Sequence, residues 1–224
     1  GMIAPDMATM LAYVMTDAAL PAPVLQSLIA RGADKSFNAI TVDSDTSTSD
    51  TVLLFATGKA GHGPVSTPDD PKLHGFIDAL DSLLIDLAQQ IVRAGEGAAK
   101  FITITVSGAR SHAAARRVAL VVGNSPLVKT AIAGEDPNWG RLVMAVGRAG
   151  EDVRPEKMVI SIGGHKVARG GKRAPGYVEK TVARHMKGRE IDIAIDLAVG
   201  RAAATVWSCD LTHKYIDINA DYRS

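Results

Sequence analysis

Residues 73–106 read LHGFIDALDSLLIDLAQQIVRAGEGAAKFITITV, and this stretch decides the fold class. From Leu73 to Val92 its apolar residues recur at every third or fourth position, which predicts one face of a long helix. The two glycines in 95–97 favour non-helical backbone and should end that helix. Residues 102–106 then alternate isoleucine or valine with threonine, the period of a half-buried strand. The stretch therefore predicts helices packed on sheets, in a protein of the α/β or α+β class.

The flanking sequence predicts further elements of both kinds. Asp136 and Pro137 resemble an N-cap and first-turn pair that opens a helix toward Gly147. The other expected helices span 21–37, 111–122 and 177–186, and the expected strands span 10–15, 39–57 (interrupted by the polar loop 43–50), 158–162, 191–197, 202–207 and 215–218. Short links between the last strands favour antiparallel pairing. No repeat or linker divides the chain, so we expect one domain over residues 1–224.

Composition excludes several classes of protein. The 224 residues carry 25 Lys+Arg and 24 Asp+Glu, and 46% are hydrophobic. This balance argues against disorder and against a dedicated nucleic-acid binder. The single cysteine, Cys209, excludes a disulfide framework and favours a reducing compartment, so we expect a cytoplasmic protein. No apolar run reaches about 18 residues, so no membrane span is expected. The first residues lack a basic region and an initiator Met, which favours a processed, tagged or partial chain over a signal peptide.

The sequence has no complete motif for binding a metal ion or a phosphate group. The run that opens at Asp43 resembles a calcium loop, but Thr48 and Leu54 occupy the positions that require Gly and Glu. Arg173 replaces the Ser/Thr of a P-loop, and the six histidines form no ligand pair. We therefore expect no metal and no nucleotide cofactor. The basic run 166–173 is interpreted as a solvated loop, with anion or nucleic-acid contact as the alternative.

Thr9 follows a small residue, Ala8, and precedes an apolar strand. A β-branched residue suits the start of a strand, which is the simpler interpretation. The alternative is a nucleophile exposed as a new N-terminus by cleavage between Ala8 and Thr9. A free α-amine has a pKa near 8 and can take the proton of its own hydroxyl, whereas an amide nitrogen is not basic. Such a nucleophile needs neither a histidine nor a metal.

Two further polar features admit both a structural and a functional interpretation. Glu96 lies between two glycines at the end of the long helix, where it is either a solvated turn residue or a carboxylate that meets a substrate ammonium group. The hydroxyl-rich loop 46–49 and the polar tail 219–224 form the other feature. Hydroxyl groups that cap their own turn are the ordinary interpretation of such a loop.

Seven runs of the sequence together carry a resemblance. They are GMIAPDMATML (1–11), TVDSDTSTSDT (41–51), GEGA (95–98), SPLVKTA (125–131), DPNWGR (136–141), CDLT (209–212) and NADY (219–222). The runs occur in the same order as in the ornithine acetyltransferase (glutamate N-acetyltransferase) family, which the chain resembles from end to end. Asp6 departs from the Asn that many members carry, beside the expected cleavage bond, which puts the efficiency of cleavage in doubt.

The resemblance implies a role for individual residues. It implies that Thr9 is the nucleophile and that the bond between Ala8 and Thr9 is cut. Glu96, Asn219 and Ser224 match the family's positions for binding the amino-acid substrate. Residues 1–8 would then be the end of an α chain and residues 9–224 a β chain. The family's oxyanion hole and its substrate-binding Thr and Lys belong to the α chain and have no match here.

The activity implied is transfer of acetyl from N-acetylornithine to glutamate through an acetyl-threonine intermediate, in arginine biosynthesis. The resemblance implies no cofactor, although some members use acetyl-CoA as a donor. It implies a helix–sheet–sheet–helix sandwich, an α-chain partner and a dimer of αβ pairs, with no membrane or nucleic-acid partner. Two alternatives remain open: a related N-terminal-nucleophile aminopeptidase, against which the run 136–141 argues, and a non-catalytic amino-acid-binding fragment.

Overall fold

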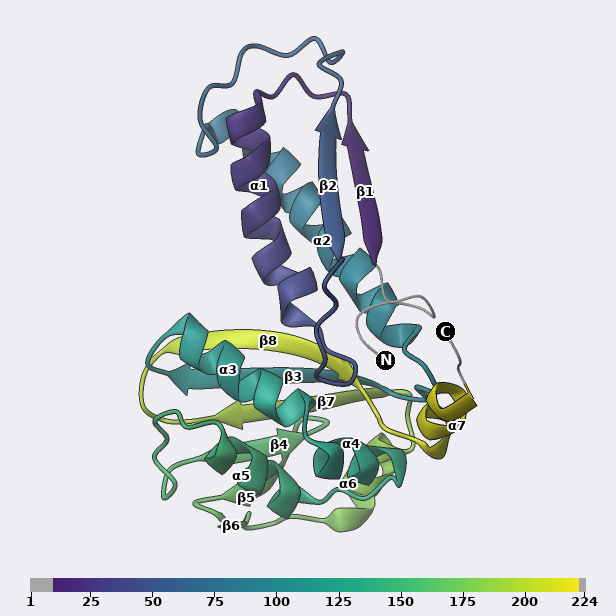
Figure 1. Cartoon of the computed structure of the whole chain (residues 1–224). Coiled ribbons are helices and arrows are strands. Elements are labelled where there is room, and N and C mark those ends of the chain that lie inside the picture. Colours follow the sequence, from purple (N-terminus) through teal and green to yellow (C-terminus); the bar gives the residue numbers. More distant parts are fainter. Residues whose placement is uncertain (1–9, 222–224) are drawn as a thin grey trace.

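The computed structural model describes residues 10–221 and shows a mixed α/β protein built around two sheets (Figure 1). The first sheet pairs β1 (Leu11–Thr16) with β2 (Thr51–Ala56) in parallel. The second sheet has six strands in the order β6-β5-β4-β7-β3-β8. Its strands are β3 (Phe101–Ala109), β4 (Val159–Ile162), β5 (His165–Arg169), β6 (Lys172–Arg173), β7 (Glu190–Asp196) and β8 (Ala202–Cys209).

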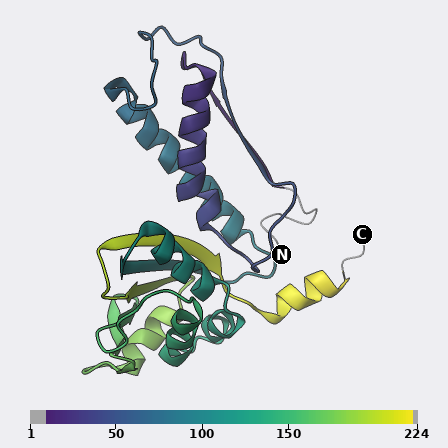
Figure 2. The ribbon, with the colours of Figure 1, turned by 60° about the vertical axis from the view of Figure 1, so that its left-hand side comes forward.

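Two long helices accompany the strand pair β1–β2. These are α1 (Ala22–Lys35) and α2 (His74–Arg93), and Figure 2 shows both on the same side of the pair. Buried residues at helical spacing on α2, such as Leu80, Leu84 and Ala88, face a core that also includes Val14 and Leu28. A single-turn helix, Phe37–Ala39, follows α1, and a second one, Pro71–Leu73, directly precedes α2. The amphipathic helix expected from the sequence is therefore confirmed.

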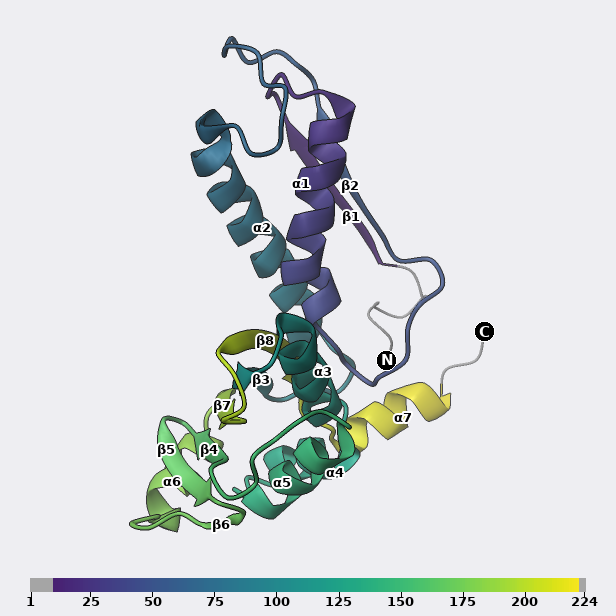
Figure 3. The same ribbon diagram turned by 90° about the vertical axis from the view of Figure 1, so that its left-hand side faces the viewer.

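The second core lies between one face of the six-stranded sheet and the helices that pack on it. The isoleucine and valine side chains of β3 and β7 are buried, while the residues between them on each strand are half-buried or exposed. The buried face packs against α3 (His112–Gly123), α4 (Pro126–Ala133), α5 (Trp139–Arg148) and α6 (Glu179–Met186). The last element, α7 (His213–Asp221), extends from the end of β8 and lies beside the sheet (Figures 1 and 3).

Most expected elements agree with the structure, and five details were wrong. Residues 215–218 lie in α7 rather than in a strand, because Tyr215 and Ile218, three residues apart, are its half-buried positions, a spacing that fits a helix as well as a short strand. Within 39–57 only Thr51–Ala56 forms a strand. The N-cap of α5 is Asn138 rather than Asp136, with its side chain accepting from the Arg141 amide at 3.3 Å.

The fourth error concerns strand pairing. Consecutive strands β7 and β8 are not neighbours, because β3 lies between them. It pairs in parallel with β7 and antiparallel with β8. A β3–β7 pair requires a long crossover, which residues 110–189 supply, so the short link from β7 to β8 passes across the end of β3. The fifth error concerns the basic run 166–173, which forms the β5–β6 hairpin instead of a loop. Its basic side chains are exposed, whereas Val167 and Ala168 between them are buried.

Candidate active site

Glu96 sits at the tip of a tight turn that connects α2 to β3. The Ala98 amide donates to the Gly95 carbonyl at 3.0 Å, which closes the turn. Gly97 has a φ of +69°, and a Cβ atom there would lie 2.5 Å from the Tyr215 backbone nitrogen. A side chain at residue 97 would therefore be strained and would collide with the start of α7. Glycine at this position lets the turn and α7 approach each other closely.

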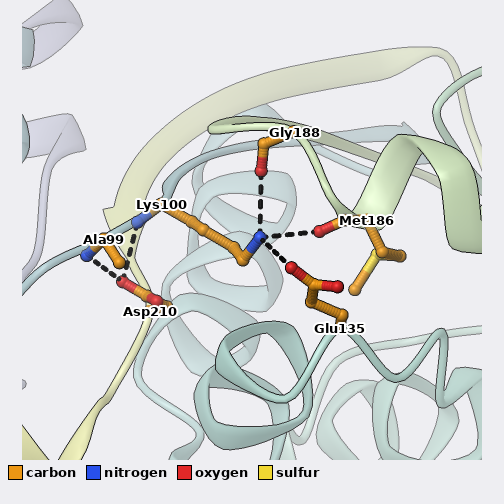
Figure 4. Close-up of polar contacts among 6 residues, drawn as sticks. All are labelled: Ala99, Lys100, Glu135, Met186, Gly188 and Asp210. Carbon is orange, nitrogen blue, oxygen red and sulfur yellow. Dashed lines mark hydrogen bonds and ion pairs between the residues drawn. The ribbon is translucent and has the colours of Figure 1, made fainter.

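Asp210, the residue after β8, fixes the far side of this turn (Figure 4). Its Oδ1 atom accepts from the Ala99 amide at 2.8 Å and from the Lys100 amide at 3.0 Å. The Asp210 amide in turn donates to the Lys100 carbonyl at 3.1 Å. Asp210 is only 4% exposed, so these bonds form away from solvent. The end of β8 thus sets the position of the chain that follows Glu96.

Thr212 and α7 bring the C-terminal segment onto the same turn. The Thr212 hydroxyl donates to the Gly97 carbonyl at 2.7 Å. Near the end of α7, the Asn219 amide donates to Glu96 Oε2 at 2.8 Å and to the Tyr215 carbonyl at 2.9 Å. Two candidate residues from distant parts of the sequence are therefore side by side, with a carboxylate and an amide presented together.

Tyr215 ties α7 to the polar loop after residue 42. Its hydroxyl donates to Asp43 Oδ2 at 2.8 Å. Burial raises the pKa of the Tyr215 phenol well above its usual range, and the hydrogen bond and charge of Asp43 raise it further. The neutral phenol is thereby held as a donor. In the loop 46–49, the Ser47 hydroxyl accepts from the Ser49 amide at 3.2 Å, the local turn capping expected for such a sequence.

Lys129 on α4 lies beneath the exit of β8 and is 2% exposed. Its ammonium group donates to the Cys209 carbonyl and, at 3.2 Å, to the Ser208 hydroxyl. Burial lowers the pKa of Lys129, and burial raises the pKa of the Cys209 thiol, whose sulfur lies 3.7 Å from Nζ. A buried amine with three acceptors around it anchors the strand end that carries Asp210.

Lys100 is a second buried lysine, at the start of β3 (Figure 4). Its Nζ atom donates to the Met186 carbonyl at 2.7 Å and the Gly188 carbonyl at 3.0 Å, and pairs with Glu135 at 3.3 Å. These contacts join β3 to the turn after α6. Sequence reasoning missed Lys100, Lys129 and Asp210. The signal available was a charged residue directly beside a predicted apolar strand or inside an apolar helix.

The remaining candidates lie at the ends of the chain. Ala8, Thr9 and Ser224 are outside the described residues. The first described residue, Met10, donates its amide to Asp50 Oδ1 at 2.9 Å and accepts from the Thr51 amide at 2.8 Å. Both strands of the pair run away from the six-stranded sheet, so β1 starts at the end nearer to α7 (Figures 1 and 3). The residue after Thr9 is thus held at the start of β1.

Residues 10–221 contain no group of three or more His, Cys, Asp or Glu side chains that could hold a metal ion. No helix in that range is long and apolar enough to span a bilayer.

The sheets and helices make this a protein of the mixed α/β class, with a polar site at a glycine turn. Comparison with known proteins identifies its family. The model of the ArgJ family matches residues 1–224, so the chain belongs to the ArgJ family. It is 58% identical to the arginine biosynthesis bifunctional protein ArgJ of Gluconobacter oxydans and 56% identical to that of Mesorhizobium japonicum. Each alignment covers 100% of this chain but only 53% and 55% of the relative.

A solved structure agrees with this assignment. The crystal structure of arginine biosynthesis bifunctional protein argJ from Bacillus halodurans, at 2.00 Å resolution, matches with a TM-score of 0.91 and 38% identity. The match covers 95% of this chain and 100% of that chain. The chain therefore spans about half the length of its curated relatives, whereas the matched crystal chain is aligned over its whole length.

Proposed function

We propose that the full-length protein transfers acetyl from N2-acetyl-L-ornithine to L-glutamate through an acetyl-Thr9 intermediate, after self-cleavage between Ala8 and Thr9. The observation that carries the proposal is the Glu96–Asn219 contact, at 2.8 Å, beside a turn that only glycine permits. It occurs in a chain of the ArgJ family whose relatives are bifunctional proteins of arginine biosynthesis.

The chemistry proceeds in two steps. The free amine of Thr9 takes the hydroxyl proton, and Thr9 Oγ1 attacks the acetyl carbonyl to form a tetrahedral oxyanion. Collapse breaks the amide bond, the ornithine nitrogen leaves with a proton, and the acetyl group remains as an ester on Thr9. The amine of glutamate then attacks this ester, and Thr9 leaves with its proton restored. The reaction needs no cofactor, and acetyl-CoA is proposed as a further donor.

Glu96, Asn219 and Ser224 are proposed to bind the amino-acid part of the substrate. A carboxylate and an amide presented together suit the ammonium and carboxylate groups of ornithine or glutamate, because each can bind one charge of the zwitterion. The glycines around Glu96 allow a close approach of the ligand to the backbone. Asp210, Thr212 and Lys129 hold this turn without contacting the substrate.

An α chain completes the proposed enzyme. It corresponds to the part of the relatives that this chain does not span, and it supplies the oxyanion donors and further substrate contacts. The alignment of the Bacillus halodurans chain over its whole length supports a form in which the two parts are separate chains. We propose that the αβ pair dimerises and acts in the cytoplasm.

Kinetics and chemical trapping test the proposal together. Initial rates against N-acetylornithine at several glutamate concentrations should give parallel double-reciprocal lines, because one product leaves before the second substrate binds. Incubation with N-acetylornithine alone should leave an acetyl group on the peptide that begins at Thr9. Thr9→Ala serves as the control and should give neither result. Intersecting lines without an acetylated peptide would contradict the intermediate and indicate direct transfer in a ternary complex.

A further inference from the structure

Asp50 ends the polar loop 43–50 and holds the backbone of Met10. Its Oδ1 atom accepts from the Met10 amide at 2.9 Å, in a partly buried hydrogen bond. The Met10 carbonyl accepts from the Thr51 amide at 2.8 Å. Both polar groups of the Met10 backbone are therefore bonded, one to a side chain and one to the neighbouring strand.

Strand pairing alone does not bond the Met10 amide. The register of β1–β2 begins with Leu11 beside Thr51, so Met10 lies before the paired residues. Met10 is 6% exposed, and a buried amide without an acceptor costs stability. The Asp50 carboxylate supplies that acceptor, and a charged acceptor forms a stronger hydrogen bond than a neutral one. Asp50 thereby extends the ordered backbone by one residue toward Thr9.

The amide that Asp50 binds belongs to the peptide group that joins Thr9 to Met10. A trans peptide group is planar, so holding its N–H also fixes the direction of its carbonyl. Only two rotatable bonds of threonine, Cα–C and Cα–Cβ, then separate this plane from the hydroxyl oxygen, and β-branching restricts the second. The first residue of a chain is poorly ordered unless contacts tie it down. A nucleophile created by cleavage before Thr9 would be such a first residue.

The start of the same loop is bonded to the substrate-binding side of the proposed site. Asp43 Oδ2 accepts from the Tyr215 hydroxyl at 2.8 Å, and the Tyr215 carbonyl accepts from the Asn219 amide at 2.9 Å. The Asp45 amide donates to Asp43 Oδ1 at 3.1 Å, which closes a local turn. The loop 43–50 therefore connects the helix that presents Asn219 to the backbone at the start of β1.

We infer that Asp50 is a positioning residue, which orients the Thr9 nucleophile through the Met10 amide. The inference rests on the function proposed above, in which the Thr9 hydroxyl attacks the acetyl group. The orientation of that hydroxyl matters, because a misplacement of about 1 Å can cost a hundredfold in rate. Asp50 contacts backbone rather than substrate, so its removal should slow the chemical step and leave substrate binding by Glu96 and Asn219 unchanged.

Single-turnover acylation of full-length variants tests this role. N-acetylornithine is added alone, and the acetylated peptide that begins at Thr9 is measured by mass spectrometry against time, per folded and cleaved chain. Asp50→Ala should lower the maximal rate about ten- to hundredfold, while the half-saturating concentration stays within about threefold of the parent value. Asp50→Asn keeps an oxygen acceptor for the Met10 amide and should stay within about threefold of the parent rate.

Asp70→Ala is the matched control. Asp70 Oδ1 also accepts a backbone amide, that of Lys72, at 3.0 Å. Residue 70 precedes α2, and the 20 residues of that helix separate it by about 30 Å from the turn at Glu96. The acylation rate of Asp70→Ala should therefore equal that of the parent.

The outcomes separate this inference from the proposed function. Acylation of Asp50→Ala at the parent rate overturns the positioning role, and so does a tenfold rise in its half-saturating concentration, which would place Asp50 in substrate binding. If the alanine variant yields no cleaved chain, Asp50→Asn decides: cleavage and acylation within about threefold of the parent support the role, and a tenfold loss overturns it. A parent protein that forms no acetyl-Thr9 rejects the proposed function itself.

Discussion

Replacing Asp210 with alanine should loosen the turn that carries Glu96. The Lys100 amide is buried and loses its acceptor, at a cost of about 1–3 kcal/mol, while the partly buried Ala99 amide loses about 1 kcal/mol. Asp210 Oδ2 is buried without a hydrogen-bond partner in the described chain, so removing the acid recovers part of its desolvation cost. The expected net loss in the free energy of unfolding is about 1–3 kcal/mol.

Asp210→Asn separates the effect of the charge from the effect of the acceptor atom. It retains an oxygen that can accept both amides, but a neutral acceptor forms weaker hydrogen bonds than a carboxylate. We expect about half the loss seen with Asp210→Ala. Asp192→Ala, on the exposed face of β7, is the matched control and should stay within about 0.5 kcal/mol of the parent protein.

The assay combines urea denaturation of the full-length protein with native-state hydrogen exchange at the Lys100 amide. Protection of that amide should fall about five- to hundredfold in Asp210→Ala, and KM for N-acetylornithine should rise more than kcat falls, because Asp210 holds backbone rather than reacting atoms. Unchanged protection of Lys100, or a loss no larger than that of Asp192→Ala, would refute the assigned role of Asp210.

Four further predictions concern single residues. Thr9→Ala should abolish both cleavage and turnover and Thr9→Ser should retain some of each, so an intact-mass spectrum showing full cleavage of the alanine variant would reject the nucleophile. Glu96→Gln should lower kcat/KM about ten- to hundredfold, the equivalent of about 1.5–3 kcal/mol, while the exposed control Glu156→Gln leaves it unchanged. The pKa of Lys129 is lowered by burial, so just below pH 10.5 this residue binds more protons in the unfolded chain than in the folded one, and the urea midpoint of the parent protein should rise relative to that of Lys129→Met as the pH is raised from 8 to 10. The raised pKa of Cys209 lowers stability over the same range but is present in both proteins. The pKa of Tyr215 is raised instead, so stability should fall as pH rises above about 10, and a Tyr215→Phe protein that still shows the full fall would contradict that origin.

The long helix and the alternating strand of residues 73–106 could be predicted because each carries a sustained period. α2 repeats its apolar face over 20 residues, and β3 alternates over most of its length. Residues 215–218 carry no such signal, because four residues fit either period. The order of the strands could not be predicted from the sequence either, because the β3–β7 pair joins residues about 90 positions apart in the chain.

The site was predictable in part, and for a different reason. Glu96 and Asn219 could be named from their motifs, and the structure brings them together. The residues that hold the turn, Asp210 and Lys129, were missed, because their one signal, a charged residue beside an apolar strand or inside an apolar helix, also occurs at surface positions. Only the burial and the backbone partners of these two side chains reveal what they stabilise.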